Sequence, residues 1–217
     1  DIIDNSVSAD ANIINILIEI TSDGRKFVYF GDDGHGMDED GLHNAMRYGA
    51  QIREDLASLG KFGLGLKTAS SSVCLKYSLI SRTNLSSPLY KLTWDLEHVS
   101  DVNNWEMVDE PVSVDEQEVF EELCGNSGTL VVWSRCDRLL SKVYEEPGGT
   151  KEQAAIRYIS NKLIEHCALI FHKYLNPSET GYRTIKIIVN GIEVEYWNPF
   201  YPECSEQVLP VKLTVLP

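Results

Sequence analysis

Apolar and polar residues alternate over residues 12–20, so that four isoleucines share one face of an extended segment. The pair Asp23-Gly24 comes next and is typical of a tight hairpin turn. Residues 26–31 then supply a return strand. The pattern therefore predicts a half-buried antiparallel hairpin near the start of the chain.

The same periodicities, with glycine and proline as breaks, predict the remaining elements. We expect helices over residues 1–11, 38–47, 67–73 and 151–174. We expect further strands over residues 75–82, 89–96, 112–120, 129–133, 185–189 and 192–196. The β-rich apolar run 129–133 is the expected central strand, and Asn190-Gly191 predicts a type I′ turn between the last two strands.

The composition fits a protein with a full hydrophobic core and no membrane span. Of 217 residues, 43% are hydrophobic, yet no apolar run reaches about 18 residues. No basic-then-apolar start indicates a signal peptide. Five scattered cysteines without a Cys-x-x-Cys pair argue against zinc and are typical of reduced thiols. We therefore expect a cytoplasmic protein, or a nuclear one if the source is eukaryotic, with no membrane contact.

The formal net charge is −14, whereas a nucleic-acid binder normally shows a basic face. We therefore expect contact with DNA only through domains outside this sequence. The same charge repels nucleotide phosphates at long range. A nucleotide site would need compensation from glycine N–H groups, lysines and a divalent cation.

Both ends of the sequence look like cuts within a longer protein. Residue 1 falls inside an expected helix, and residues 211–216 have the pattern of a strand that is cut short. We therefore interpret the chain as a fragment.

Residues 59–70 hold three glycines within six positions, directly before an expected helix. Glycine allows close backbone approach, and a helix start offers unpaired N–H groups and a positive dipole end. This pattern predicts an anion site, with a plain tight turn as the alternative. It is not a P-loop, because the Gly-x-x-x-x-Gly-Lys-Ser/Thr spacing is absent. Seven glycines between residues 34 and 65 indicate a lid that moves over a ligand.

Three other segments carry residues that suit a ligand site. One face of the first helix holds a polar stripe, which a solvated face would also explain: Asp1, Asp4, Asn5 and Ser8. Asp32 follows a strand and precedes two glycines, an arrangement typical of binding loops and also of plain acidic turns. Thr129 follows a glycine at the start of the expected central strand.

Together, these four segments resemble the Bergerat-fold (GHKL) ATPases, the superfamily of gyrase, heat-shock chaperones, histidine kinases and mismatch-repair proteins. Within this superfamily, four sequence motifs resemble those of the microrchidia (MORC)-like branch and its bacterial relatives. The motifs are Asp-Asn-Ser at 4–6, Asp-Gly-His-Gly-Met at 33–37, Gly-Lys-Phe-Gly-Leu-Gly-Leu-Lys-Thr-Ala-Ser at 60–70 and Gly-Thr-Leu-Val-Val-Trp-Ser-Arg-Cys-Asp-Arg-Leu at 128–139. The resemblance covers residues 1–140 and continues more loosely through 190–191 and 198–200.

The resemblance implies an α+β fold, a two-layer sandwich in which helices cover one face of a mixed, mostly antiparallel sheet and a flexible lid closes over ATP. Residues 1–140 are the expected ATP-binding core, with the start of its first helix missing. Residues 141–217 are expected to complete the sandwich with a helix and a hairpin, or to begin a truncated transducer-like domain.

The resemblance also implies roles for single residues. Asn5 matches the asparagine that binds Mg²⁺, a cation that prefers oxygen ligands. Asp32 matches the aspartate that accepts a hydrogen bond from the adenine amine, and guanine would leave that acceptor unpaired. Thr129 matches the threonine that completes the adenine contacts.

Other positions are implied to surround the nucleotide. Gly36 would keep the base pocket open, and Met37 would pack on the base. Lys61 or Lys67 would offset the phosphate charge, with neither favoured. The full set of implied nucleotide-binding residues is Asn5, Asp32, Gly34, Gly36, Met37, Gly60, Lys61, Phe62, Gly63, Leu64, Gly65, Lys67 and Thr129.

Asp1 departs from the family pattern. The family places a glutamate here, one helical turn before the asparagine, to orient and deprotonate the attacking water. An aspartate is one methylene shorter, and a loss of about 1 Å of reach costs on the order of 10²-fold in rate. We therefore expect Asp1 to be the catalytic carboxylate of a slow enzyme.

Three functions stay open at this point. The first is a Mg²⁺-dependent ATPase whose lid closure drives formation of a homodimer. The second is a nucleotide-gated binding module without effective hydrolysis, which the shorter Asp1 would explain. The third, a histidine-kinase-type kinase, is disfavoured because no phosphoacceptor helix is visible.

Overall fold

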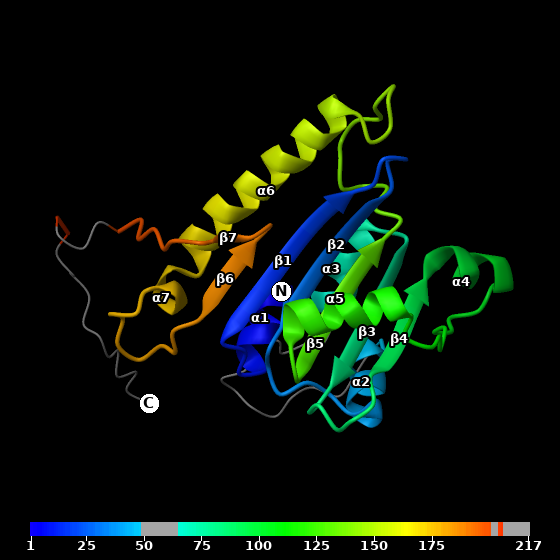
Figure 1. The fold of residues 1–217 in the computed structure, drawn as a ribbon, viewed down its shortest axis with the longest axis horizontal. Helices are drawn as coiled ribbons and strands as arrows, with labels where there is room; N and C mark the ends of the chain where they lie inside the picture. The colour runs from blue at the N-terminus through cyan, green and yellow to red at the C-terminus, as the bar shows by residue number, and fades with distance from the viewer. Residues whose placement is uncertain (49–64, 201–203, 206–217) are drawn as a thin grey trace, which may run out of the picture.

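The computed structural model describes residues 1–48, 65–200 and 204–205. Within them, seven strands form one sheet in the order β4-β3-β5-β2-β1-β6-β7 (Figure 1). The strands are β1 Ile13–Ile20, β2 Lys26–Asp32, β3 Lys76–Arg82, β4 Tyr90–Asp95, β5 Gly128–Ser134, β6 Lys186–Val189 and β7 Ile192–Glu193. The helices are α1 Ile2–Ser8, α2 Glu39–Met46, α3 Gly65–Val73, α4 Leu96–Val102, α5 Val114–Cys124, α6 Thr150–Ile170 and α7 His172–Leu175.

The sheet is mixed and mostly antiparallel, as expected. β1 pairs with β6 in parallel, and the other neighbouring strands pair in antiparallel fashion. β5 lies between β3 and β2, which confirms the predicted central strand. Asn190 and Gly191 both have positive φ, at 48° and 79°, as a type I′ turn requires.

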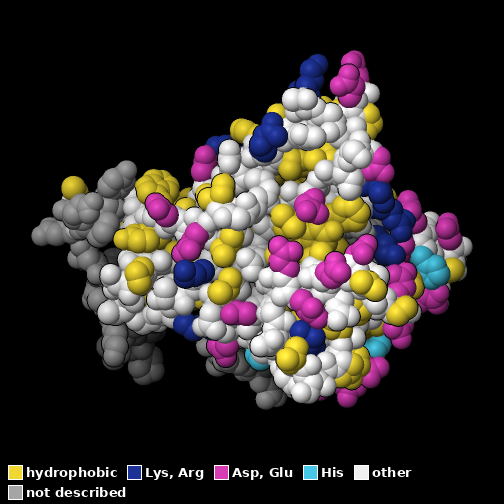
Figure 2. Space-filling model, viewed as in Figure 1, with side chains coloured by type: hydrophobic (Ala, Val, Ile, Leu, Met, Phe, Trp, Pro, Cys, Tyr) yellow, Lys and Arg dark blue, Asp and Glu magenta, His cyan; other side chains and the backbone are white. Residues whose placement is uncertain are grey.

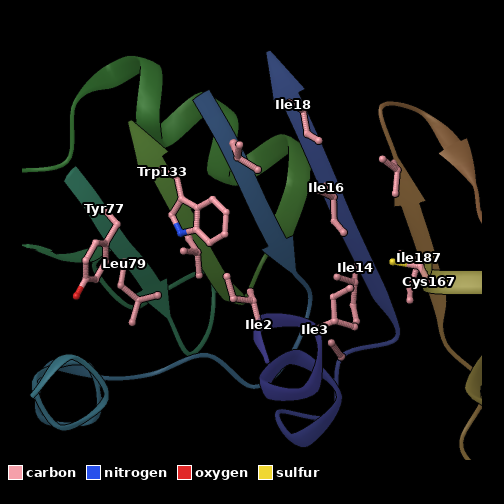
Figure 3. Packing of buried hydrophobic residues seen from close by; sticks show 14 of the residues in the cluster. Ile2, Ile3, Ile14, Ile16, Ile18, Tyr77, Leu79, Trp133, Cys167 and Ile187 are labelled. Carbon is pink, nitrogen blue, oxygen red and sulfur yellow. The ribbon is translucent and has the colours of Figure 1, made fainter. Parts of the chain in front are cut away.

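The main core lies between the sheet and the helices of one face. Alternate isoleucines of β1 point into it, together with Ile3 of α1 and Cys167 of α6 (Figure 3). Ile14, Ile16 and Ile18 are all buried, which confirms the alternation seen in the sequence. α6 and β6 contribute to the same cluster, so residues on both sides of the predicted boundary at 140 share one core. The division at 140 itself stays a prediction.

The opposite face of the sheet is partly covered by α5, which lies in front of the strands in Figure 1. Phe120 and Cys124 of α5 pack with Ile80, Leu130 and Val132 in a second, smaller cluster. Helices were expected on one face only, so α5 adds a partial third layer. Figure 2 shows acidic and apolar side chains interspersed across this face, in keeping with the net charge of −14.

The predicted strand over residues 112–120 is wrong, because this segment belongs to α5. The Ser113 hydroxyl accepts a hydrogen bond from the Glu116 N–H (3.2 Å), and the Glu116 carboxylate accepts one from the Ser113 N–H (2.9 Å). This capping box starts a helix and satisfies two of its free donors. The Ser-x-x-Glu spacing of this box is visible in the sequence at 113–116.

One further difference concerns the end of β4. Helix α4 was not predicted: Asp95 ends β4 and caps the helix by accepting from the N–H groups of Glu97 and His98.

No helix among the described residues is long and apolar enough to cross a bilayer. Residues 49–64 of the predicted lid and the predicted strand at 211–216 lie outside the described residues, whereas residues 34–48 of that lid include α2.

Candidate functional site

The site is built around Asp32, the last residue of β2. Its side chain is buried and points toward α1, where Ser6 Oγ donates to Oδ2 at 2.8 Å. The Gly34 N–H donates to the other oxygen, Oδ1, at 3.0 Å. Burial raises the pKa of Asp32 above its ordinary value of 3.8, and these two donors oppose the rise. Asp32 is therefore a desolvated carboxylate whose acceptor positions are held in place.

Thr129 and Ser81 stand beside Asp32 in one row across three strands. The β2–β5 register sets Asp32 opposite Thr129, and the β3–β5 register sets Thr129 opposite Ser81. Directly opposed side chains on one face lie about 4.5–5.5 Å apart at Cβ. Thr129 and Ser81 are buried, and their hydroxyl oxygens are 3.0 Å apart. The sheet thus brings together Asp32 and Thr129, two of the predicted adenine contacts.

Two glycines allow the backbone to close tightly around this row. A Cβ on Gly36, at φ 63°, would lie 2.0 Å from the Arg82 carbonyl oxygen. A Cβ on Gly128, at φ 132°, would lie 1.8 Å from the Asp32 carbonyl oxygen. Gly36 was predicted to keep the base pocket open, and the structure shows that backbone packing already requires a glycine there.

The other predicted residues of this loop lie close by. A Cβ on Gly34 would meet the Ala9 carbonyl oxygen at 2.6 Å. Met37 packs against the main core, and its N–H donates to Ser81 Oγ at 2.8 Å. The loop after β2 is therefore tied to both α1 and β3.

Asp1 and Asn5 sit one turn apart on α1, as their spacing predicted. Asp1 occupies the N-cap position without a side-chain hydrogen bond to the helix, its side chain is 66% exposed, and Asn5 is half-buried. A Cβ on Gly65 would lie 3.1 Å from the Asp1 Cβ and Cγ atoms. The start of α3, which follows the glycine stretch, therefore adjoins the predicted catalytic carboxylate.

The donors on α1 suit a magnesium ion. The Asn5 amide oxygen and the nearby carboxylates of Asp1 and Asp4 are hard oxygen ligands, and Mg²⁺ needs only one or two such ligands besides phosphates and water. No cluster of three His, Cys, Asp or Glu side chains that could hold a metal occurs among the described residues.

Lys67 lies in the interior. It is 1% exposed, Nζ donates to the Ala45 carbonyl oxygen at 2.7 Å, and Nζ stands 5.9 Å from the centre of the Tyr48 ring. Burial lowers the pKa of Lys67 below its ordinary value. The ammonium thus joins α3 to the end of α2, and we expect it not to reach the phosphates.

Replacing Lys67 with methionine tests this position. We expect Lys67→Met to leave ATP affinity and thermal stability at pH 7 unchanged or slightly raised, because it removes a desolvated charge while keeping the volume. A lowered folded-state pKa means that the unfolded chain holds more protons, so the wild type gains stability as pH rises toward 10.5. The variant should lack that gain in urea titrations at pH 7 and pH 10.

Lys26→Met is the matched control for this substitution. Lys26 Nζ lies 2.7 Å from Glu152 Oε1, so the variant leaves a buried carboxylate without its cation and should lose about 2–3 kcal/mol. If Lys67→Met weakened ATP binding tenfold or more, the interior role of Lys67 would be refuted.

Five predicted nucleotide contacts lie outside the described residues: Gly60, Lys61, Phe62, Gly63 and Leu64. Their roles stay predictions. Conversely, the structure adds Ser6 and Ser81, which sequence reasoning did not select. Ser6 follows Asn5 directly, but only the packing of α1 against β2 brings its hydroxyl to Asp32.

One protein family and one curated protein are similar to this chain in sequence. Residues 1–129 match the family described as histidine kinase-, DNA gyrase B- and HSP90-like ATPase. Among curated proteins, Protein MICRORCHIDIA 3 of Arabidopsis thaliana is 34% identical over 74 residues, which are 32% of this chain and 13% of the plant protein.

Two solved structures are also similar to this chain. One is the Aquifex aeolicus MutL ATPase domain complexed with ADP, with a TM-score of 0.41, 14% identity, and coverage of 91% of this chain and 60% of that one. The other is the N-terminal domain of a DNA repair protein, with a TM-score of 0.42, 19% identity, and coverage of 86% and 45%. The chain thus spans less than two thirds of the length of each of these relatives.

Proposed function

This chain belongs to the family of histidine kinase-, DNA gyrase B- and HSP90-like ATPases, and we propose that its α1–β2–β5 site binds ATP and hydrolyses it slowly with Mg²⁺. The observation that supports this most strongly is the buried Asp32 carboxylate, held by Ser6 and Gly34 beside Thr129. A desolvated acceptor of this kind selects a ligand that brings its own donor. The exocyclic amine of adenine is such a donor.

The phosphates would lie toward α1 and the start of α3. Asn5 offers its amide oxygen there, and a Mg²⁺ ion bound with the nucleotide would neutralise charge on the phosphate oxygens. Because the protein carries a net charge of −14, this compensation matters for affinity. The residues of the glycine stretch at 60–64 are proposed to contribute backbone N–H groups.

Asp1 is proposed as the general base for the attacking water. It lies one turn before Asn5 and adjoins Gly65, and this position beside the start of α3 supports the proposed role next to the γ-phosphate. Its shorter side chain supports a low turnover rate. The alternative is a nucleotide-gated binding module without effective hydrolysis, for which the same short and exposed side chain is the supporting observation.

A comparison of nucleotides with and without Mg²⁺ tests the proposal. We expect ATP and ADP to raise the melting temperature of the chain and GTP not to. A ligand at one hundred times its Kd adds about 2.7 kcal/mol to stability. Phosphate release should require Mg²⁺ and fall at least about tenfold in Asn5→Ala, because the metal loses its protein oxygen.

Asn12→Ala is the matched control, because Asn12 is exposed and lies outside the site. Equal shifts with ATP and GTP would count against an adenine site. Unchanged turnover in Asn5→Ala would refute the metal role, and ATP binding without any phosphate release would favour the binding module.

Lid closure over ATP and dimerisation driven by ATP are part of the proposal by family membership. DNA contact through other domains and a cytoplasmic or nuclear location are proposed on the same basis.

A further inference from the structure

Ser81 lies at the centre of the site wall with no exposed surface. Three groups surround its hydroxyl oxygen. The Met37 N–H is 2.8 Å away, the Gly128 carbonyl oxygen is 2.7 Å away, and Thr129 Oγ1 is 3.0 Å away. Ser81 therefore connects the loop after β2 with the start of β5.

Counting hydrogens fixes the direction of these bonds. A serine hydroxyl has one hydrogen to donate and two lone pairs that accept. The Met37 N–H can only donate, so it takes one lone pair of Ser81 Oγ. The Gly128 carbonyl can only accept, so it takes the single hydrogen. One lone pair of Ser81 remains, and it faces the Thr129 hydroxyl.

The Thr129 hydroxyl must then donate its hydrogen to Ser81. Its oxygen is left with lone pairs alone, so toward the ligand Thr129 can accept but cannot donate. Asp32, directly opposite on β2, is also an acceptor when ionised. The wall therefore presents two acceptors side by side.

We propose that Ser81 is a specificity-determining residue, which excludes nucleotides with a carbonyl at position 6 of the purine by holding the Thr129 hydroxyl as an acceptor. The inference rests on the proposed ATP site. Where both acceptors face position 6, the amine of adenine can donate both of its hydrogens. The carbonyl of hypoxanthine or guanine would meet lone pairs there, and the N1–H of these bases could donate to one acceptor at most. Ser81 acts through Thr129 and need not touch the nucleotide, so it is a positioning residue.

Ser81→Ala tests this role through base selectivity. Without the serine lone pair, the Thr129 hydrogen is free to rotate toward the ligand and to donate to a carbonyl. We expect the ratio of the Kd values for ITP and ATP to fall about tenfold relative to the wild type, which corresponds to one good hydrogen bond. ITP is the probe, because hypoxanthine lacks the 2-amino group of guanine.

Ser78→Ala is the matched control. Ser78 is also buried on β3, and its hydroxyl lies 2.8 Å from Thr93 Oγ1 on β4. Ser78→Ala should lower the free energy of unfolding, as loss of a buried serine hydroxyl generally does. The ratio of the Kd values for ITP and ATP should stay unchanged. A fall of similar size in Ser78→Ala would show a general loosening of the sheet and would overturn the role of Ser81.

Thr129→Val provides a second measurement that does not depend on the folding of Ser81→Ala. Loss of an acceptor should weaken ATP binding and leave ITP binding unchanged or stronger, whereas loss of a donor would weaken ITP binding. Equal or greater weakening of ITP would overturn the inference, as would an unchanged ratio in folded Ser81→Ala. A wild type that binds ATP and ITP equally would overturn this inference alone, while one that binds neither would also refute the proposed function.

Discussion

Gly36→Ala is expected to destabilise the chain by at least about 3 kcal/mol, a large share of the 5–15 kcal/mol that holds a typical domain together. Two effects add at this position. Gly36 has φ 63°, where a Cβ is unfavourable. The new Cβ would also lie 2.0 Å from the Arg82 carbonyl oxygen, a backbone atom that cannot rotate away. The loop after β2 would have to move away from Arg82 at the end of β3 to relieve this clash.

Gly191→Ala separates the two effects. Gly191 has a φ of 79° in the turn after β6, but no atom lies within 4 Å of the position of its Cβ. It should lose only about 1 kcal/mol, the cost of the backbone conformation. Urea unfolding of both variants measures the difference, and equal losses would show that the contact with Arg82 is not decisive.

Asp32→Asn is expected to weaken ATP binding about 100-fold while leaving the fold intact. The substitution puts an amide where a charged acceptor should meet the adenine amine, and losing such a bond costs about 1.5–3 kcal/mol. The amide can still accept from the Gly34 N–H and can donate to Ser6 Oγ. Stability at pH 7 should therefore be equal to or above that of the wild type.

The pH dependence of unfolding checks the physical reason. A folded-state pKa above 3.8 means that the native state holds the Asp32 proton longer than the unfolded chain does. Stability of the wild type thus falls as pH rises from 3.8 through the raised pKa of Asp32. Asp32→Asn should lack this part of the slope.

Asp33→Asn is the matched control. It makes the same chemical change one residue later, at a carboxylate that accepts from the N–H groups of Asn12 and Ile13. ATP affinity should be unchanged in this variant. If isothermal titration gave Asp32→Asn the same affinity as the wild type, an adenine contact at Asp32 would be refuted.

Local patterns were sufficient where a short stretch of chain decides its own structure. The isoleucines of β1 alternate because one face is buried, and Asn190-Gly191 turns because both residues tolerate positive φ. The predicted strand at 112–120 is wrong because this acidic, irregular stretch carries a local helix-start signal, the Ser113–Glu116 capping box.

Packing between distant elements decided the remaining features. Lys67 follows the glycine stretch in the sequence, yet its ammonium is drawn inward to Ala45 by the way α3 meets α2. Ser6 and Ser81 carry common side chains with no distinctive spacing. They become part of the site only because α1 packs on β2, and because β5 pairs with both β2 and β3.

The sequence by itself determined the strands of the described sheet, apart from the wrong one at 112–120, together with the turns and the ATPase family, and it selected Asp32 and Thr129 as the residues proposed to face the base. These follow from periodicity and from short motifs, which depend on neighbouring residues. Only the tertiary structure decided which hydroxyls hold Asp32 and Thr129 and why Gly36 must lack a side chain. Those features depend on hydrogen-bond directions and backbone distances between segments that lie far apart in the chain.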